Sequence, residues 1–252
     1  MAAPTVATTV ATSTTTPAAI TSGPVAWSDG DIIVVLVAIE NYAGNGTNPA
    51  DNPSISSVSA TNFTFTKYSE LTVPSGNGPV ASVWWGKNNS GLSGSVAITA
   101  NLAAPGYYDN AIICAVVISG ADTTSPFDSD ATLPSVVTWN GGTGNGLTPN
   151  FNTTTPDDLV LAFNSGPSNF NVPPGVPSSG WTPAVIIPNT ENAGGVSIVT
   201  TYIAGEGISG TLSGANFSNS VGGYPASFVA AIKPASSPSG NKGIPASHFL
   251  LA

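Results

Sequence analysis

GDIIVVLV at residues 30–37 decides the fold, because this aliphatic run returns later in the chain as DDLVLAF at residues 157–163. Three further runs recur in the same order: VASVWW (80–85) with VSIVTTY (196–202), GLSG (91–94) with GISG (207–210), and AIICAVVI (111–118) with ASFVAAI (226–232). Solenoids and propellers usually need three or more copies of a unit. Two copies are therefore few for such an architecture. The four matched runs predict instead one β-rich unit that occurs twice in tandem, which suits a scaffold or binding module better than an enzyme.

Short runs rich in Val, Ile, Thr and aromatic residues, separated by Gly, Pro, Asn and Asp, predict strands along the whole chain. We expect these strands at residues 31–39, 55–66, 79–87, 94–101, 110–119, 147–154, 157–164, 180–187, 195–204, 208–217 and 225–233. The runs at 31–39 and 110–119 are apolar throughout, as in central strands covered on both faces. The 28 glycines and 22 prolines oppose helix formation.

The predicted fold is all-β, with two tandem related β-sandwich units of jelly-roll or immunoglobulin-like type. The two units are either separate or merged into one pseudo-symmetric sandwich. The expected parts of the chain are an N-terminal arm or first strand at 1–23, a first unit at 24–122, a linker loop at 123–146, a second unit at 147–235 and a flexible C-terminal tail at 236–252.

Charged residues are scarce in this chain. Four lysines, no arginine and thirteen acids give a formal net charge of -9, and only 7% of residues are charged, against about a quarter in ordinary proteins. Binding to nucleic acid or to an anionic membrane needs clustered Lys and Arg, so neither partner is expected. A surface of Ser, Thr, Asn, Gly and Ala suits a subunit buried against neighbours. The other interpretation is that the scarcity of charged residues reflects only the general amino-acid usage of the source organism.

Catalytic chemistry finds little support in the sequence. Cys114, the only cysteine, lies in an apolar strand and is expected to be a small core residue. His248, the only histidine, lies in the C-terminal tail, so a catalytic triad or a histidine zinc site would have to recruit it. No spacing of carboxylates indicates a glycosidase pair. We expect no catalytic residue, no cofactor and no enzymatic activity.

Acidic loops are the candidate metal ligands. Asp128-Ser129-Asp130, Asp157-Asp158 and Asp29-Gly30-Asp31 offer carboxylate oxygens for Ca²⁺, but no EF-hand loop is present. Asp31 and Asp158 hold matching positions in the repeat, directly before a strand. This placement favours a turn role in which the carboxylate bonds local backbone N–H groups. We therefore expect no metal site.

The candidate interaction residues are aromatic or apolar. Adjacent strand residues point to opposite faces, so one of Trp84 and Trp85 is expected to face the core and the other to face outward, where it stacks on a sugar or anchors a protein interface. The pair Tyr107-Tyr108 follows Pro105-Gly106 in a loop. The tail ends in Phe249, Leu250 and Leu251, which form either a docking peptide or a frayed terminus.

The N-terminus, MAAPTV, has neither the positive start nor the unbroken apolar core of a secretory signal. No stretch approaches the ~18 apolar residues of a membrane span. If Met1 is natural, we expect release into the cytoplasm, and a surface of this chemistry then points to a virus particle assembled inside a cell. A mature secreted protein carrying a tag-derived Met1 is the competing explanation.

Several strand ends and turns carry a resemblance to a known group of proteins. These are Gly30-Asp31 before an aliphatic strand, VISGA at 117–121 ahead of Pro126-Phe127-Asp128, and AAIKPA at 230–235. The chain resembles, over about residues 25 to 235, β-sandwich proteins of tailed-phage virions, of the capsid decoration (cement) or fibre type.

That resemblance implies a non-enzymatic virion structural protein, with a phage capsid decoration protein on the outer capsid surface as the favoured role. Its partners would be the major capsid protein or other virion subunits, which it would bridge through uncharged β surfaces. Few charges and two irregular ends predict a homo-oligomer, with a trimer preferred. The alternative is a carbohydrate-binding or adhesin module on a fibre or at the cell surface, with a glycan as its partner.

Overall fold

The longest aliphatic runs of the chain form adjacent strands at the centre of one sheet. Strand β4 (Ile32–Ile39) pairs antiparallel with strand β10 (Asn110–Ser119), and every residue of β4 is buried. Because neighbouring strand residues point to opposite faces, a strand buried at every position must be covered on both sides. The prediction of doubly covered central strands is therefore confirmed for these two runs.

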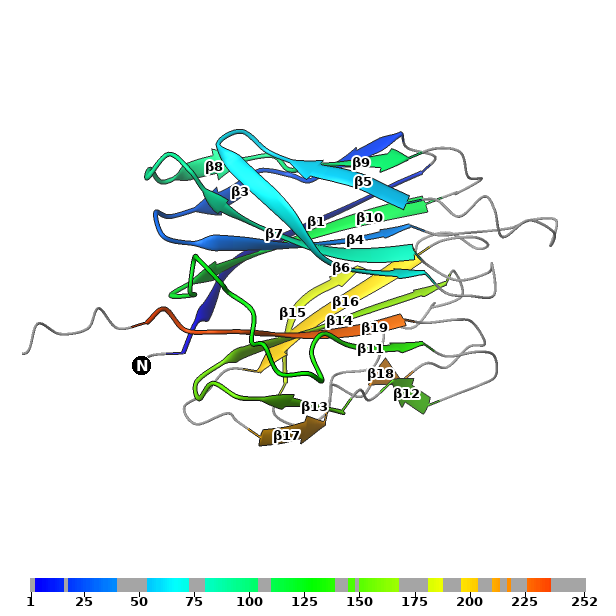
Figure 1. The fold of residues 1–252 in the computed structure, drawn as a ribbon. Coiled ribbons are helices and arrows are strands. Elements are labelled where there is room, and N and C mark those ends of the chain that lie inside the picture. The colour runs from blue at the N-terminus through cyan, green and yellow to red at the C-terminus, as the bar shows by residue number, and fades with distance from the viewer. Residues whose placement is uncertain are drawn as a thin grey trace, which may run out of the picture.

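The computed structural model describes residues 3–15, 18–39, 54–72, 80–103, 110–138, 145–147, 150–167, 181–187, 196–203, 210–213, 217–218 and 226–236. Every regular element within these ranges is a β-strand (Figure 1), which confirms the predicted all-β class. None of these residues lies in a helix long and apolar enough to cross a membrane.

Two five-stranded antiparallel sheets form the middle of the molecule. The first sheet has the order β1-β10-β4-β7-β6, and the second sheet has the order β11-β19-β14-β16-β15. Ranked along the chain, the strands of both sheets follow the order first, fifth, second, fourth, third. Their bounds are β1 (Thr5–Thr15), β6 (Phe63–Thr72), β7 (Val80–Asn88), β11 (Ser135–Thr138), β14 (Leu159–Pro167), β15 (Thr182–Ile187), β16 (Val196–Ile203) and β19 (Ala226–Ile232).

Small sheets accompany each of the two large ones. Beside the first sheet lie the three-stranded sheet β2-β9-β5 and the pair β3-β8, and beside the second lie the pairs β13-β17 and β12-β18. Their bounds are β2 (Ala19–Thr21), β3 (Val25–Trp27), β5 (Ser54–Ser59), β8 (Gly94–Val96), β9 (Thr99–Ala103), β12 (Asn145–Leu147), β13 (Asn150–Thr153), β17 (Gly210–Ser213) and β18 (Phe217–Ser218).

The sheets stack in four layers, which run from top to bottom of Figure 1. One face of the first sheet packs on its small sheets and contributes Val35 and Ile113 to that core. Its other face packs on the second sheet, and the core that they share includes Leu36, Cys114 and Phe163. Cys114 is fully buried there, so its predicted place in the core is confirmed.

The far face of the second sheet has a core of its own. Val160 and Val229, which belong to the sheet, pack with Phe151 from β13 in this smaller core. Three layers of apolar side chains thus separate four layers of sheet. The large sheets are held together by buried aliphatic and aromatic contacts, a non-directional stabilisation that scales with apolar area removed from water.

Several predicted strands are divided or displaced in the structure. The single strand expected at 55–66 is two strands, β5 and β6, joined by a turn in which Asn62 has a φ of 65°. The runs expected at 94–101, 147–154 and 208–217 are likewise two short strands each.

Two of the predicted segments of the chain, residues 1–23 and 123–146, contribute strands to the large sheets. The segment 1–23, expected as an arm or a first strand, supplies β1, which pairs along its length with β10. The segment 123–146, expected as a linker loop, contains β11, which pairs with β19 at the edge of the second sheet. Residues 135–138 of the expected linker are thus an edge strand of the second sheet.

Candidate functional site

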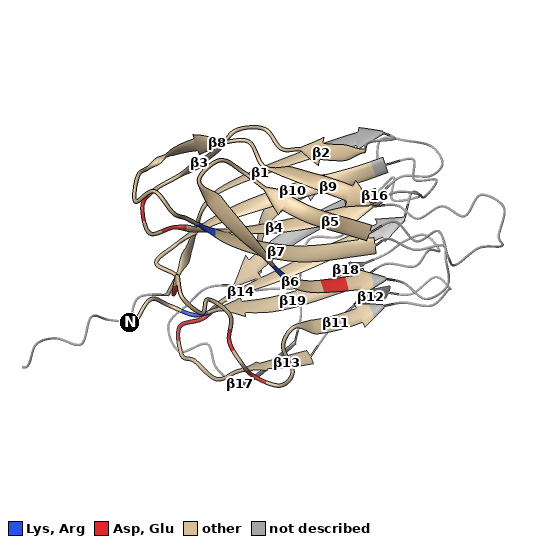
Figure 2. Cartoon of the chain, turned by 45° about the horizontal axis from the view of Figure 1, so that its top comes forward, with Lys and Arg blue, Asp and Glu red and all other residues tan. Residues whose placement is uncertain are grey.

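Acidic side chains gather where the chain enters the second strand of each large sheet. Asp29 and Asp31 lie in the turn before β4, and Asp158 directly precedes β14. The loop after β10 adds Asp122 and Asp128. Figure 2 shows most of the acidic segments at this end of the stack. These five residues define what we call the acidic end.

An open pocket of about 510 Å³ lies at the acidic end. The chain leaving β10 and the chain leaving β19 meet beside it, because Asp122 N donates to Lys233 O at 3.0 Å and Ala235 N donates to Gly120 O at 2.8 Å. The lining is mostly polar, and it consists of Asp29, Gly30, Asp31, Ser119, Gly120, Ala121, Asp122, Thr123, Thr124, Ala235 and Ser236. Such a lining offers many hydrogen-bonding groups and no aromatic platform.

Two carboxylates of the pocket are fixed by local hydrogen bonds. Asp31 accepts from Ser28 N at 2.8 Å and from Ser119 Oγ at 2.7 Å, which confirms the turn role predicted for it. Asp122 accepts from the backbone N–H groups of Thr124 and Ser125, and the bond from Thr124 is the main cause that lowers the pKa of Asp122. Both carboxyl groups thus fix the loop ends through hydrogen bonds.

Asp128 is the most strongly hydrogen-bonded carboxylate of the acidic end. Its oxygens accept from Thr154 N at 2.6 Å, Thr155 N at 3.0 Å, Thr154 Oγ1 at 2.7 Å and Asp130 N at 2.8 Å. Burial by itself raises the pKa of a carboxyl group, but these bonds outweigh burial and lower the pKa of Asp128 to about 2. Asp128 therefore joins the loop after β10 to the turn before β14.

Asp158 has the opposite electrostatic character. Its side chain is fully buried, and no hydrogen-bond donor among the described residues reaches either carboxyl oxygen. Burial, followed by the hydrogen bond and the negative charge of Asp128, raises the pKa of Asp158 to about 8. The turn role predicted for Asp158 was wrong, because no described backbone N–H group bonds either of its carboxyl oxygens.

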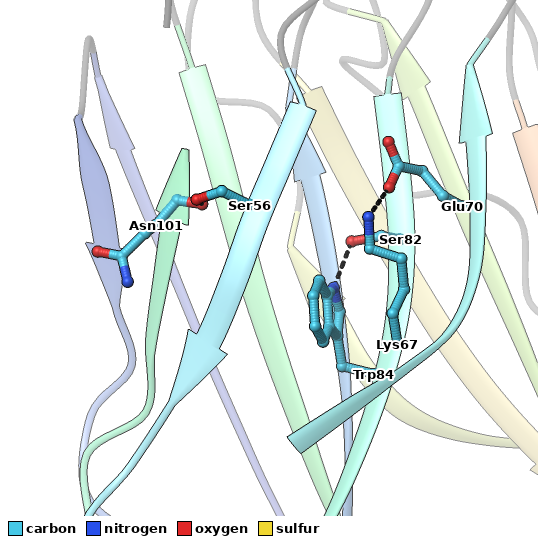
Figure 3. Close-up of polar contacts among 6 residues, drawn as sticks. All are labelled: Ser56, Lys67, Glu70, Ser82, Trp84 and Asn101. Atoms are coloured by element: carbon cyan, nitrogen blue, oxygen red, sulfur yellow. Dashed lines mark hydrogen bonds and ion pairs between the residues drawn. The ribbon is translucent and has the colours of Figure 1, made fainter. Parts of the chain in front are cut away.

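Trp84 and Trp85 lie on opposite faces of β7, as their adjacent positions require. Trp84 is buried in the core beneath the small sheets, and its Nε1 donates to Ser82 Oγ at 2.7 Å (Figure 3). Lys67 lies over the Trp84 ring at 5.1 Å from its centroid and forms an ion pair with Glu70. Trp84 thus holds the core position of the pair.

Trp85, the other member of the pair, is half-buried. It packs against the shared core and meets the Phe127 ring edge-on, with centroids 6.2 Å apart. Phe127 also stacks on Tyr68 at 3.6 Å. Burial, and then the charge of Asp128, raises the pKa of Tyr68 to about 12. Trp85 is therefore one of three aromatic rings that join the loop after β10 to the first sheet.

The remaining predicted interaction residues are Tyr107, Tyr108, Phe249, Leu250 and Leu251, and all five lie outside the described residues. His248 lies outside them as well. Among the described residues, no three His, Cys, Asp or Glu side chains are grouped so that they could hold a metal ion.

The pairing of Asp128 with Asp158 was not predicted from the sequence. Both residues stood among the acidic loops, but in separate groups. The motif Pro126-Phe127-Asp128 had drawn attention only as part of the resemblance. No protein-family model, curated protein or solved structure matches this chain.

Proposed function

We propose that this protein is a non-enzymatic structural subunit of a virus particle, and that it decorates the outer surface of a phage capsid by bridging neighbouring capsid subunits. The observation that carries the proposal is the four-layer stack, in which two large sheets with the same strand order share one apolar core. A body of this kind is rigid and close-packed, as a protein that reinforces a shell requires.

The strand order supports a duplicated β-sandwich unit. β4, β7 and β10 occupy the same positions in the first sheet as β14, β16 and β19 in the second, and these are the strands that the sequence repeat matches. Ile32 pairs with Ile118 where Leu159 pairs with Ile232, so the matched strands also share their register. Each proposed unit combines a large sheet with its small sheets, and the two units merge through the shared core.

The surface chemistry supports contacts with other protein subunits. Exposed positions of β5 and β6 carry hydroxyl groups, including Ser56, Ser59, Thr64 and Thr66. Interface cores are depleted in charged residues, and hydroxyl-bearing surfaces lose little charge solvation when they are covered. Binding through such surfaces should persist at 1 M salt, where the screening length is about 3 Å.

The homo-oligomer, with a trimer preferred, remains part of this proposal. The N-terminal segment is used within the first sheet, where β1 pairs with β10. The C-terminal segment 236–252 is thus the end assigned to neighbouring subunits. Ser236 is exposed at the pocket of the acidic end, so a partner that takes up this segment would lie next to that end.

The test is the location of the protein in particles from its source. Density-gradient fractions are probed with an antibody against the full chain, and its copy number is compared with that of the major capsid protein by quantitative mass spectrometry. A fixed ratio to the capsid protein, with labelling on the outside of intact particles, supports the proposal. Absence from purified particles would refute it.

The alternative, a glycan-binding or adhesin module, rests on the aromatic group Trp85, Tyr68 and Phe127. These rings are half-buried, with Phe127 stacked on Tyr68 and edge-on to Trp85, so little ring face is left for a sugar. A glycan array with full-length protein and with Trp85→Ala separates the two roles. Specific binding that Trp85→Ala abolishes would favour the alternative.

A further inference from the structure

The loop of residues 121–134 holds the two large sheets together, and we call it the clasp loop. It leads from β10 of the first sheet to β11 of the second. Phe127 stacks on Tyr68 of the first sheet, with ring centroids 3.6 Å apart and planes at 11°. The next residue, Asp128, donates its backbone N–H to Ala231 O of the second sheet at 2.9 Å. Neighbouring residues of the clasp loop thus contact different sheets.

The carboxylate of Asp128 accepts four hydrogen bonds from described donors. Three bonds come from the turn before β14, through the N–H and Oγ1 of Thr154 and the N–H of Thr155, and a fourth comes from Asp130 N within the loop. A carboxylate with several such donors is strongly favoured as the anion. Asp128 therefore favours the ionised form and is the poorer proton holder of the two carboxyl groups.

Asp158 lies against this anion without a donor of its own. It is fully buried, and none of the described N–H or O–H groups reaches its carboxyl oxygens. Two carboxyl groups that interact through a side-chain hydrogen bond, as Asp158 and Asp128 do, cannot both be ionised at low cost, so one of them keeps a proton. The geometry assigns that proton to Asp158, because Asp128 already accepts four bonds. The other charged groups that act on Asp158 are Lys233, which favours its ionisation, and Asp157, which opposes it.

We propose that Asp158 and Asp128 form a proton-dependent latch, in which the neutral carboxyl of Asp158 donates to the carboxylate of Asp128 and fastens the clasp loop to the second sheet. When the proton leaves, two adjacent anions face each other in a buried place. The ionised carboxylate of Asp158 must then be hydrated, and the clasp loop detaches from the start of β14. This device goes beyond the proposed structural role and does not depend on it.

The sign of the pH effect follows from proton linkage. The pKa of Asp158 is about 8 in the folded protein, above the value of about 3.9 for an ordinary aspartate. Between those two values the folded state holds a proton that the unfolded state has lost, so stability falls as the pH rises. The unfolding equilibrium constant should increase by up to about tenfold per pH unit across this window, and level off above it.

Denaturant unfolding of the full-length protein between pH 5 and 9 tests the latch. In Asp158→Asn, the Nδ2 group donates to Asp128 at every pH, so the decline should be lost. At pH 8 unfolding should then be less favourable than in the wild type by up to about 10,000-fold, which is the tenfold change per pH unit summed over the roughly four units between the two pKa values. Asp31→Asn, at the matching position of the first sheet, is the control and should keep the wild-type slope. Parallel pH profiles for the wild type and Asp158→Asn would overturn the proposal.

A direct measurement covers the case in which Asp158→Asn does not fold. At pH 6 ordinary carboxyl groups are ionised, so an infrared carboxylic-acid C=O band from the wild type reports a group such as Asp158. The band should disappear by about pH 9, while amide exchange at Asp128 and Asp130 accelerates beyond the intrinsic effect of pH. A spectrum at pH 6 without this band would overturn the latch.

Discussion

The two large sheets place an aspartate at the same position, directly before the second strand, yet surround it differently. In the first sheet Asp31 follows a turn and accepts a bond from Ser119 Oγ, which lies one residue beyond the end of the Ile32–Ile118 register. In the second sheet the residue one beyond Ile232 is Lys233, whose Nζ donates to Ser125 Oγ at 3.5 Å. One position of the same sheet topology therefore holds a hydrogen-bonded carboxyl group in one copy and a carboxyl group without a described donor in the other.

A second difference lies deeper in the sheets. Val37 pairs with Ile113 in the first sheet, and at the corresponding place in the second Asn164 pairs with Ser227. Asn164 Oδ1 and Ser227 Oγ are buried, and no described group bonds either atom. A buried polar atom left without a partner costs about 1–3 kcal/mol. The described buried polar atoms of the first sheet are thus better hydrogen-bonded than those of the second, and substitutions in the two sheets can test this difference.

The largest expected effect tests whether the sheets are independent at all. Phe163→Ala removes a fully buried ring of the second sheet from the shared core, and it should lower the free energy of unfolding by about 3–5 kcal/mol. Leu36→Ala, from the first sheet, should cost about 2–5 kcal/mol. Far-ultraviolet circular dichroism and tryptophan fluorescence should report one common transition in both variants. Two separate transitions would show that the sheets unfold independently.

Removal of the Asp31 carboxyl group from the first sheet should be the next largest effect. Asp31→Ala leaves Ser28 N and Ser119 Oγ without their acceptor in a place that is 6% exposed. We expect a loss of about 1–3 kcal/mol at pH 7, measured by urea unfolding. The sign is opposite to that expected for Asp158→Asn at the same pH, and equal signs for the two variants would break the comparison.

Two buried serines give a pair of effects, the larger of them similar in size to that of Asp31→Ala. Ser82→Ala removes the acceptor of Trp84 Nε1 and should destabilise the protein by about 1–3 kcal/mol. Ser227→Ala removes a hydroxyl that has no described partner, so its effect should be near zero or stabilising. Thermal unfolding of both variants at one pH is sufficient, and an equal loss in both would contradict the assignment of the better satisfied sheet.

The smallest effect concerns an edge. β6 carries the ion pair of Lys67 and Glu70 at the edge of the first sheet, whereas β15, at the same position in the second, has no charged residue. Glu70→Gln should cost about 0.2–1 kcal/mol, because exposed ion pairs are weak. The difference from the wild type should shrink in 1 M salt. A loss that salt leaves unchanged would mean that Glu70 acts through packing.

The sequence predicted the central strands well because a strand that is buried on both faces has an uninterrupted run of apolar residues. The turn between β5 and β6 was missed because residues 60–62 contain neither Gly nor Pro. The run at 55–66 alternates Ser, Thr and aromatic residues, so the turn between β5 and β6 is concealed until Asn62 takes a positive φ. Asn tolerates this conformation better than most residues, which is a weak signal in retrospect.

The candidate site depends on tertiary contacts, which sequence spacing does not report. Asp128 and Asp158 belong to different loops, and they meet only because the clasp loop docks on the turn before β14. Trp85 was expected to face either outward or into the core, and alternation correctly separated it from Trp84. The contact of Phe127 with Trp85 comes from the same docked loop. The sequence therefore failed to predict this contact and the pairing of Asp128 with Asp158 for one reason, which is that both depend on how the clasp loop docks.

The position of β1 has a consequence for how the chain folds during synthesis. This first strand pairs with β10, and Thr9 Oγ1 donates to Ala184 O, across 175 residues of sequence. The earliest part of the chain therefore has no lasting partner until β10 exists, and it is not fully in place until β15 does. Folds dominated by such distant pairings are slow, in the range of milliseconds to seconds. A nascent chain of this protein should keep its threonine-rich strand β1 unpaired until β10 has been made, and a chaperone that shields strand edges should raise its yield.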